Sequence, residues 1–364
     1  MATLSEDVFD GKSREAAATA TVNEAPVIRT LMNRSDWLTL IALAVIWGAA
    51  FLFISVAVRE VEPLTYVWLR LTLAAAAMWL FLWWRGEKAG LPRQVWGSIL
   101  VLALFNNAIP FVLFGWGQTH IASGLAAILN STTPIWGVVV AHLYTDDEKL
   151  SGRKLAGVLL GFGGVTVMIG PALLGSLGNN VLAQLACVAA ALCYAFAGVW
   201  ARRYRGMGVK PISVTTGQLT AGALVMLPVA LLVDRPWLDA LPSLKAIGAI
   251  AALAVVCSAF AYILYFRLID RAGATNALLV TLLVPPVAIV LGALVLGEVI
   301  GLRDLAGLAL IAIGLAAIDG RLLKAFAAGP ARRAASLPHR RSSRGRRRSA
   351  TLPVPARRRR SWSA

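Results

Sequence analysis

The chain has 364 residues, of which 58% are hydrophobic and only 15% are charged, and its mean hydropathy is +0.72. A soluble domain of this size carries about 25% charged residues, so the composition excludes an ordinary soluble protein and indicates a membrane protein. The net charge of +17 is not distributed like a nucleic-acid-binding surface, because twelve of the 35 Lys and Arg residues lie in the last 33 residues.

The apolar segments predict ten membrane-spanning helices, since a helix needs about 20 residues to cross a bilayer. We place these spans at residues 37–57, 64–84, 95–117, 122–144, 153–171, 181–200, 212–233, 245–268, 273–296 and 303–320. Residues 1–36 are polar and predict a disordered cytosolic arm, with no cleavable signal peptide.

Residues 321–364 form a basic tail in which Arg clusters at 346–348 and 357–360 are separated by Ser and Pro. Such a composition cannot bury a core and predicts disorder in the cytosol. The tail is a candidate for attraction to anionic lipid headgroups, and the alternative is a solvated segment that only reinforces the topology. We expect no nucleic-acid partner.

Basic residues are distributed unequally between alternate loops, which predicts the orientation of the chain. With the N-terminus in the cytosol, the cytosolic loops hold twelve Lys and Arg residues and the opposite loops hold four. Both termini are therefore expected in the cytoplasm. The prediction is an integral, multi-pass protein of a bacterial-type inner or plasma membrane.

Two parts of the chain that lie 150 positions apart repeat each other. Residues 148–157 and 298–307 share five of ten aligned positions, and in both copies an apolar run containing Pro leads to an acidic residue and a Leu-Ala-Gly helix. Ten spans in two copies leave five in each, and consecutive copies with an odd number of spans enter the membrane in opposite directions. The predicted fold class is therefore an all-α membrane protein with two inverted five-helix repeats, residues 37–171 and 172–320.

Several short motifs occur in the order found in a known family. They are Trp47-Gly48, Pro63-Leu64, Leu69-Arg70, Gly297-Glu298 and the two blocks that end in Leu-Ala-Gly. Through them, residues 37–320 resemble the EamA-type transporters of the drug/metabolite transporter superfamily. The resemblance implies ten helices in two inverted repeats and secondary transport of small organic solutes, commonly outward across the inner membrane. One departure is Asp146-Asp147-Glu148-Lys149, where the family usually has Gly-Glu-Arg.

An inverted-repeat transporter is expected to hold its solute near the midplane, between the halves. Polar and aromatic residues well inside the predicted spans are therefore candidate solute-binding residues. They are Trp47, Arg70, Asn106, Asn107, Asn130, Tyr194, Gln218, Tyr262 and Asn276. The candidate helix breaks are Pro110, Pro134, Pro285 and Pro286. Glu148 and Glu298 follow the ends of two spans, and we expect capping or gate-like contacts from them.

The polar candidates in the first half have structural alternatives. A charge inside a span is costly, so Arg70 predicts a function, but an arginine tied to backbone carbonyls or extended to the surface explains it equally. Asn106 and Asn107 mark either a cavity-facing break before Pro110 or hydrogen bonds between helices.

Asn130, Trp47 and a set of glycines likewise have both a functional and a structural interpretation. Asn130 lies four residues before Pro134, which frees a carbonyl there and favours a cavity. Trp47 either stacks on an aromatic or cationic ligand or fills the interface between the halves. Close helix packing, rather than a ligand, explains the small residues of the fifth and tenth spans. These are Gly157, Gly161, Gly164, Gly307 and Gly314.

Motifs for other chemistry are absent from the sequence. The three cysteines lie inside apolar spans without metal-ligand spacing, so we expect neither a disulfide framework nor a metal site. No Walker-type motif occurs, which favours secondary transport over direct use of ATP. No Asp or Glu falls in the middle third of any predicted span, so no deep proton relay is visible and ion coupling stays open.

Two other classes of protein are alternatives to a transporter. A membrane-embedded enzyme needs a nucleophile with a partner, but the chain has no HExxH motif and Ser123 lacks the Gly two places upstream that a Gly-x-Ser-Gly site requires. The second alternative is a membrane channel or a non-transporting membrane scaffold, and a channel should show a ring of like polar groups at one depth, which one chain does not display. We expect a transporter, not an enzyme, with no cofactor. A mostly neutral cavity suits amino acids, nucleosides or other metabolites, and the solute and the oligomeric state stay open.

Overall fold

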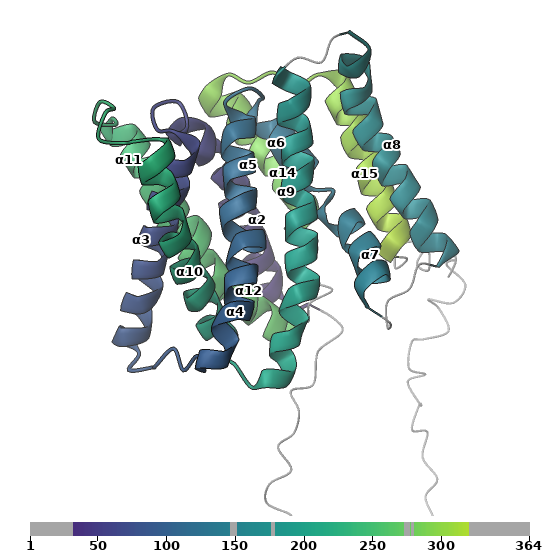
Figure 1. Ribbon diagram of the computed structural model, residues 1–364. Helices are drawn as coiled ribbons and strands as arrows, with labels where there is room; N and C mark the ends of the chain where they lie inside the picture. The colour runs from purple at the N-terminus through teal and green to yellow at the C-terminus, as the bar shows by residue number, and fades with distance from the viewer. Residues whose placement is uncertain (1–31, 146–150, 176–178, 273–276, 278–279, 320–364) are drawn as a thin grey trace, which may run out of the picture. The chain divides into compact units, whose positions relative to one another are not determined.

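The computed structural model describes residues 32–145, 151–175, 179–272, 277 and 280–319 (Figure 1). All of them belong to the compact unit that ends at Gly320. Every regular element within these ranges is a helix, which confirms the predicted all-α class.

The first half of the chain begins its helices where the sequence supplies start signals. Its α-helices are α2 (Arg34–Ala57), α3 (Pro63–Trp84), α4 (Trp96–Ala103), α5 (Ile109–Gln118), α6 (Ser123–Asn130), α7 (Thr133–Tyr144) and α8 (Gly152–Gly175). Asn33 caps α2 in a capping box with Asp36. Pro63 lies in the first turn of α3, where a missing N–H leaves no helical hydrogen bond unmade. Pro110 and Pro134 lie in the first turns of α5 and α7, directly after other helical turns.

The second half follows the same plan. Its helices are α9 (Asn179–Ala201), the 3₁₀-helix η3 (Arg202–Met207), α10 (Pro211–Val233), α11 (Leu244–Ala254), α12 (Ala261–Ala272), α14 (Val280–Leu291) and α15 (Leu302–Asp319). Ser243 caps α11 by accepting a hydrogen bond from the N–H of Ala246. The predicted spans agree with these bounds to within a few residues, apart from the start of the ninth span, part of which lies outside the described residues.

In the part of the chain that the structure describes, three helical segments contain π-helical turns: η2 (Leu104–Ala108), between α4 and α5, η4 (Val255–Phe260), between α11 and α12, and η5 (Gly292–Leu296), after α14. A π-turn inserts a residue into the helical ladder and re-aims the side chains around it, and such turns are frequent at functional sites. Asn106 and Asn107 therefore lie in a π-turn before Pro110, where the sequence had suggested a break. The span predicted at 122–144 is divided between α6 and α7 by a turn at Ser131 and Thr132, just before the predicted helix break at Pro134.

The exposed surface is strongly apolar, as expected for a chain that crosses a bilayer. Seven helical segments in the described ranges are long and apolar enough to span a membrane, and the shorter apolar helix Leu283–Leu296 lies beyond them in sequence. Large apolar side chains such as Trp83, Trp84 and Leu80 are more than half exposed. In water such a surface would be unstable, and in lipid it is the solvated one. The protein is an integral, multi-pass membrane protein.

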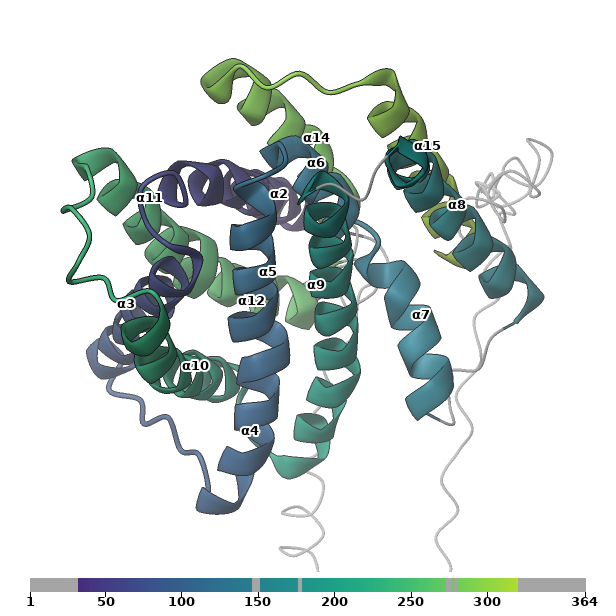
Figure 2. The same cartoon turned by 45° about the horizontal axis from the view of Figure 1, so that its top comes forward.

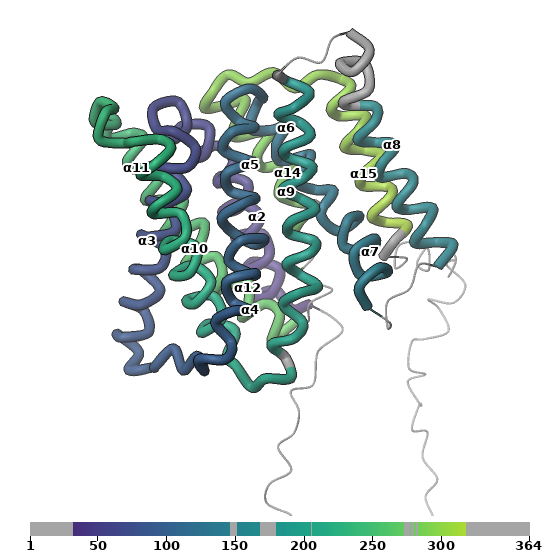
Figure 3. The backbone as a smooth tube through the Cα atoms, in the orientation of Figure 1, coloured from purple at the N-terminus to yellow at the C-terminus, as the bar shows by residue number. Residues whose placement is uncertain are grey.

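Helices from the two halves of the chain pack against each other in matched pairs. α3 lies against α10 and α8 against α15, as Figures 1 and 2 show. α2 packs on α14 and α11, while α9 packs on α7 and α5 (Figure 3). The partners in each pair come from opposite sides of residue 172, so most of the core lies between the halves rather than within either one.

Glycines allow the α8–α15 pair to approach backbone to backbone. A Cβ atom on Gly164 would lie 2.7 Å from the carbonyl oxygen of Gly307, and one on Gly314 would lie 2.6 Å from the carbonyl oxygen of Gly157. These approaches confirm that the small residues serve close helix packing.

Candidate functional site

A group of polar side chains lies among the helices that join the two halves. We call Arg70, Asn106, Gln218, Ser258 and Tyr262 the polar cluster. They come from α3, η2, α10, η4 and α12, so two belong to the first half and three to the second. Hydrogen bonds connect Arg70 to Ser258, and Asn106 to both Gln218 and Tyr262. The positive charge of Arg70 also acts on the Tyr262 hydroxyl, which places the two sets in one neighbourhood.

Arg70 is buried, at 5% exposure, and does not extend to the surface. Its Nε–H donates to the Ser258 Oγ at 3.2 Å, and its guanidinium carbon lies 3.6 Å from the centre of the Phe111 ring. The Ser258 hydroxyl donates its own proton to the carbonyl oxygen of Leu253 at 2.8 Å, which leaves its lone pairs to accept from Arg70. The guanidinium is thus held by a neutral oxygen and an aromatic face.

Asn106 connects three helices through its amide. Its Nδ2 donates to the Gln218 Oε1 and to the Tyr262 Oη, each at 3.1 Å. Gln218 is 3% exposed, and an amide buried at this depth needs a partner. In this structure the side chain of Asn106 therefore makes hydrogen bonds between helices, the second of the two interpretations that the sequence allowed.

Asn107, the next residue, is fully buried, and neither its Nδ2 nor its Oδ1 has a hydrogen-bond partner among the described residues. An amide buried without partners costs about 1–3 kcal/mol for each unsatisfied group. Such a cost within a π-turn is typical of a functional position rather than of a packing element.

Trp47 and Tyr194 border the polar cluster from α2 and α9. The Trp47 indole Nε1–H donates to the carbonyl oxygen of Cys257 at 3.2 Å, one residue before Ser258, and its ring lies 5.3 Å from that of Tyr265. The Tyr194 ring stacks on Phe114 at 6.1 Å, and the charge of Arg70 acts on its hydroxyl. Sequence reasoning had selected both residues, and the structure brings them to the same region as Arg70.

The remaining candidates lie apart from the cluster or outside the described residues. Pro134 has no N–H for the Asn130 carbonyl, and the Thr133 hydroxyl takes its place with a hydrogen bond of 2.7 Å, so this carbonyl is satisfied locally. Pro285 and Pro286 lie inside α14. Asn276 and Glu148 lie outside the described residues.

Glu298 caps a helix of the other half. Its Oε1 accepts from the N–H of Ser123 at 2.8 Å, and its Oε2 accepts from the Ser123 hydroxyl at 2.7 Å and from the N–H of Gly124 at 3.2 Å. A carboxylate at the start of α6 satisfies N–H groups that lack helical partners and complements the positive end of the helix dipole. A pocket of about 340 Å³ adjoins this contact and is lined by Glu298, Arg59, His120 and Gln118, among others.

Two more carboxylates make the same kind of contact, so we call the three together the carboxylate clamps. Asp234 accepts from the N–H and the hydroxyl of Thr65 at 2.7 and 2.9 Å. Glu60 accepts from the N–H and the hydroxyl of Ser243 at 2.7 and 2.8 Å. These hydrogen bonds, the backbone one first, lower the pKa of Glu60.

Every clamp joins a residue of the first half to one of the second, and the helix starts that the clamps bind, those of α3, α6 and α11, lie at the upper end of the molecule in Figure 1. We call this end the clamp end. The sequence had suggested a capping contact for Glu298 but had not singled out Glu60 or Asp234.

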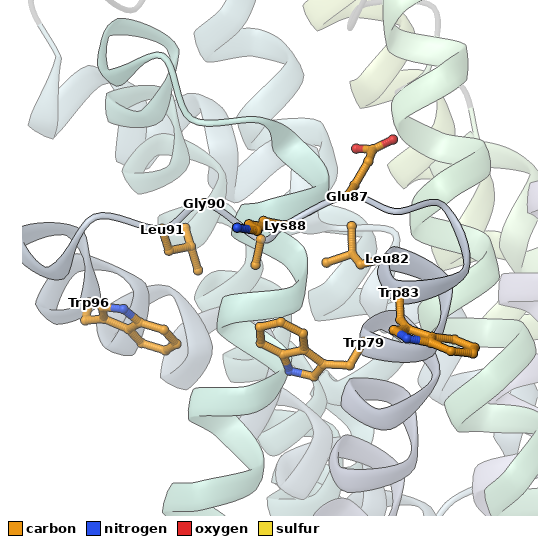
Figure 4. Close-up of a pocket in the computed structure, with 9 residues that line it drawn as sticks. Trp79, Leu82, Trp83, Glu87, Lys88, Gly90, Leu91 and Trp96 are labelled. Carbon is orange, nitrogen blue, oxygen red and sulfur yellow. The ribbon is translucent and has the colours of Figure 1, made fainter.

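A larger pocket, of about 450 Å³, lies at the opposite end of α3 and away from the polar cluster. Figure 4 shows Trp79, Trp83 and Trp96 below the chain segment that carries Glu87 and Lys88. Tryptophans at the end of a spanning helix, next to charged residues, are typical of the membrane–water interface. This pocket has the composition of a lipid-facing surface rather than of a solute site.

Sequence reasoning missed the residues that hold Arg70, namely Ser258 and Phe111. The repeat offered a signal for the first of them, because a shift of 150 positions carries η2 onto residues 254–258. The second π-turn, η4, occupies nearly the same residues. Across the described ranges, no group of three His, Cys, Asp or Glu side chains is arranged to hold a metal ion.

The helices and the polar cluster define a multi-pass helical membrane protein with a polar centre between its halves. The model of the EamA-like transporter family matches this chain twice, at residues 36–170 and 181–318. The chain therefore belongs to the EamA-like transporter family, and the resemblance drawn from its motifs is confirmed.

Relatives agree with this assignment. An uncharacterized transporter of Archaeoglobus fulgidus is 26% identical over 77% of this chain and 96% of its own length. The uncharacterized transporter YoaV of Bacillus subtilis is 24% identical over 76% of this chain and 94% of its own length. The uncharacterized inner membrane transporter YedA of Escherichia coli K12 is 27% identical over 71% and 82%. A solved crystal structure with 20% identity covers 80% of this chain and 99% of its own, with a TM-score of 0.57, and shares the fold.

Proposed function

We propose that this protein is a secondary transporter that moves small organic solutes, such as metabolites, by alternating access between two inverted five-helix halves. The observation that carries the proposal is the polar cluster, which draws its side chains from both halves and includes two π-turns. A solute held there would contact both halves at once. Rocking one half against the other would then expose the solute to each side of the membrane in turn.

The inverted arrangement is supported by contacts that map onto each other. Moving Gly164 and Gly307 each by 150 positions, in opposite directions, produces the pair Gly314 and Gly157, and both pairs make the same backbone approach. The pairing of α2 with α14 corresponds to that of α9 with α7, and the pairing of α12 with α2 to that of α9 with α5. Such reciprocity is the mark of a two-fold relation. Ten spans in two such halves place the halves in opposite orientations.

Topology reporters test this arrangement. In a bacterial inner membrane, a reporter fused after Gly178 should report the periplasm and one fused after Gly208 should report the cytoplasm, with both termini cytoplasmic. A fusion after Trp84 should also report the cytoplasm and serves as an internal control. The reverse pattern would exclude ten spans with cytoplasmic termini, and with it the inverted halves.

The clamp end offers a test of alternating access. Purified protein carrying Glu60→Cys and Ser243→Cys is reconstituted in vesicles that are loaded with a small-molecule extract of bacterial cells, and the release of each compound is followed by mass spectrometry. A short, cleavable thiol cross-linker between the two positions should stop release, and cleavage of the linker should restore it. The variants that carry only one of the two added cysteines are the controls. Release that continues through the cross-linked protein would exclude a mechanism in which the clamp end opens.

Direction and location complete the proposal. The excess of basic residues in alternate loops favours cytoplasmic termini in an inner or plasma membrane, and the family resemblance favours export. Deletion cells should accumulate the exported compound inside, whereas overexpressing cells should release more of it.

A further inference from the structure

Arg70 is a buried cation without a buried anion. Its neighbours, the hydroxyls of Ser258 and Tyr66 and the Phe111 ring, carry no formal charge. Among the described residues no carboxylate makes an ion pair with it. The carboxylates of the clamps are bound to Ser or Thr at helix starts, and Glu87 is paired with Arg85 and Lys210.

An uncompensated charge is costly inside a membrane protein, and such charges are typical of solute or ion pathways. The polar groups around Arg70 can orient a ligand but cannot neutralise the charge. The hydroxyls of Tyr66, Tyr194 and Tyr262 lie within reach of its electrostatic field, and the amides of Asn106 and Gln218 are neutral. The cluster as a whole therefore keeps one net positive charge.

The geometry of the guanidinium narrows the ligand further. The Ser258 hydroxyl binds Nε–H, the Phe111 ring covers one face, and the Tyr66 hydroxyl is a further neutral neighbour of the guanidinium. An anion would therefore approach the remaining N–H donors at the edge of the plane, on the two Nη groups. A carboxylate matches this edge with two parallel hydrogen bonds, which a neutral amide or a hydroxyl cannot provide. A cationic solute would be repelled.

We propose that Arg70 is the counter-ion for a carboxylate of the transported solute, so that the substrates of this protein are organic acids or amino acids rather than neutral or purely cationic compounds. The inference rests on the transport function proposed above and names its substrate class. The Asn106–Gln218–Tyr262 set would bind the remaining polar groups of the solute, and Ser258 positions the guanidinium.

The first experiment identifies the compounds that the protein transports and asks whether each carries a carboxylate. Full-length protein is reconstituted in vesicles loaded with a bacterial small-molecule extract, and every compound released faster than from protein-free vesicles is identified by mass spectrometry. We expect the released compounds to carry a carboxylate. If all of the released compounds lack an acidic group, the inference is overturned and the transport function stands. If no compound is released faster than from protein-free vesicles, the transport function itself is overturned.

Variants then test the role of Arg70 directly. Arg70→Gln should reduce carboxylate release about ten- to one-hundredfold, as expected for the loss of a charge-assisted, two-pronged contact. Arg70→Lys keeps the positive charge but loses the planar guanidinium that can donate two parallel hydrogen bonds, so it should retain part of the carboxylate release. The control is Arg203→Gln, since exposed Arg203 also lies over an aromatic ring, that of Trp200, at 3.1 Å, and its variant should transport normally.

A ligand-binding measurement covers the case in which a variant folds poorly. For the wild type in detergent, millimolar carboxylate forms of the released compounds should raise the unfolding temperature, and their primary amides should not. Equal stabilisation by acid and amide would overturn the inference. Ser258→Ala should weaken the carboxylate effect while leaving the selectivity for acid over amide unchanged, as expected for a positioning residue.

Discussion

At the clamp end, three carboxylates each accept hydrogen bonds from the start of a helix, whereas in the polar cluster the Arg70 guanidinium has neutral neighbours, among them the Ser258 and Tyr66 hydroxyls and the Phe111 ring. Both regions join the two halves of the chain. The acids are satisfied by the protein itself, so they can hold an end of the molecule closed. The positive charge of Arg70 has no anionic partner among the described residues, so an anionic ligand can supply one. This difference in hydrogen-bond and charge partners suggests that the carboxylate clamps close the solute path, whereas Arg70 binds the solute within it.

The largest expected effect comes from giving Arg70 an anion of its own. In Ser258→Asp, the new carboxylate would replace the hydroxyl that now accepts from Nε and would form an ion pair with the guanidinium. Carboxylate release from vesicles should then fall at least about a hundredfold, because the internal anion competes at very high effective concentration. The matched control is Ser258→Asn, which has nearly the same size and no charge. Normal release from the Asp variant would contradict the role of Arg70 as a counter-ion.

The second effect concerns the strongest clamp. Glu298→Ala removes an acceptor of three hydrogen bonds and exposes the start of α6, so the free energy of unfolding should fall by about 2–3 kcal/mol. Hydrogen exchange at the backbone amides of Ser123 and Gly124 should also accelerate, because both amides lose their acceptor on Glu298. Glu298→Gln keeps the shape and one acceptor and should show a smaller change. Unaltered exchange at both amides in the Ala variant would show that the clamp does not hold this end.

The extent to which the sequence predicted these regions follows from the range of the interactions. Hydropathy placed the helices well, because a span needs a set length of apolar residues. The small residues at helical spacing in the fifth and tenth spans predicted close helix packing, which the glycine contacts of α8 and α15 confirm. The positions of the helices and the packing of the small residues can be predicted because both follow from patterns among residues close together in the sequence.

Other features depend on packing that no local pattern encodes. Arg70 could be singled out as a costly charge, but its partner Ser258 lies 188 positions away, and Ser is common in apolar spans. The sequence predicted breaks near Pro110 and Pro134, but not that the first would be a π-turn at Leu104–Ala108, because hydropathy does not register one extra residue in a helical ladder. Likewise, the partners of Glu60 and Asp234 lie in loops and helix starts brought together only by the fold.

A third prediction compares two buried glutamines. Gln218→Leu would leave Asn106 without one of its two acceptors and should slow solute release about tenfold, since a buried hydrogen bond contributes about 1 kcal/mol and its loss leaves a donor unsatisfied. Gln184 in α9 is also buried, but its Oε1 has no partner among the described residues. Gln184→Leu should therefore leave release unchanged and stability unchanged or higher. Equal effects of the two variants would mean that the polar cluster serves packing alone.

The smallest effect, and the one that most directly measures a clamp, is the titration of Glu60. Hydrogen bonds from the N–H and the hydroxyl of Ser243 lower the pKa of this exposed carboxyl below its usual value of 4.5. A lowered pKa means that the contact stabilises the folded state above pH 4.5 and that this contribution is lost as the pH falls through the folded-state pKa. The wild type should thus lose a small part of its stability below pH 4.5 that Glu60→Gln does not lose.

Carbon-detected NMR of the Glu60 carboxyl should show its midpoint below 4.5 in the wild type. In Ser243→Ala the midpoint should move only part of the way back, because the backbone N–H, the larger cause of the shift, remains. A midpoint at 4.5 in the wild type would mean that the clamp is open in solution. That outcome would leave the clamp end without one of its three links, while Arg70, buried in the other region, would still lack an internal anion.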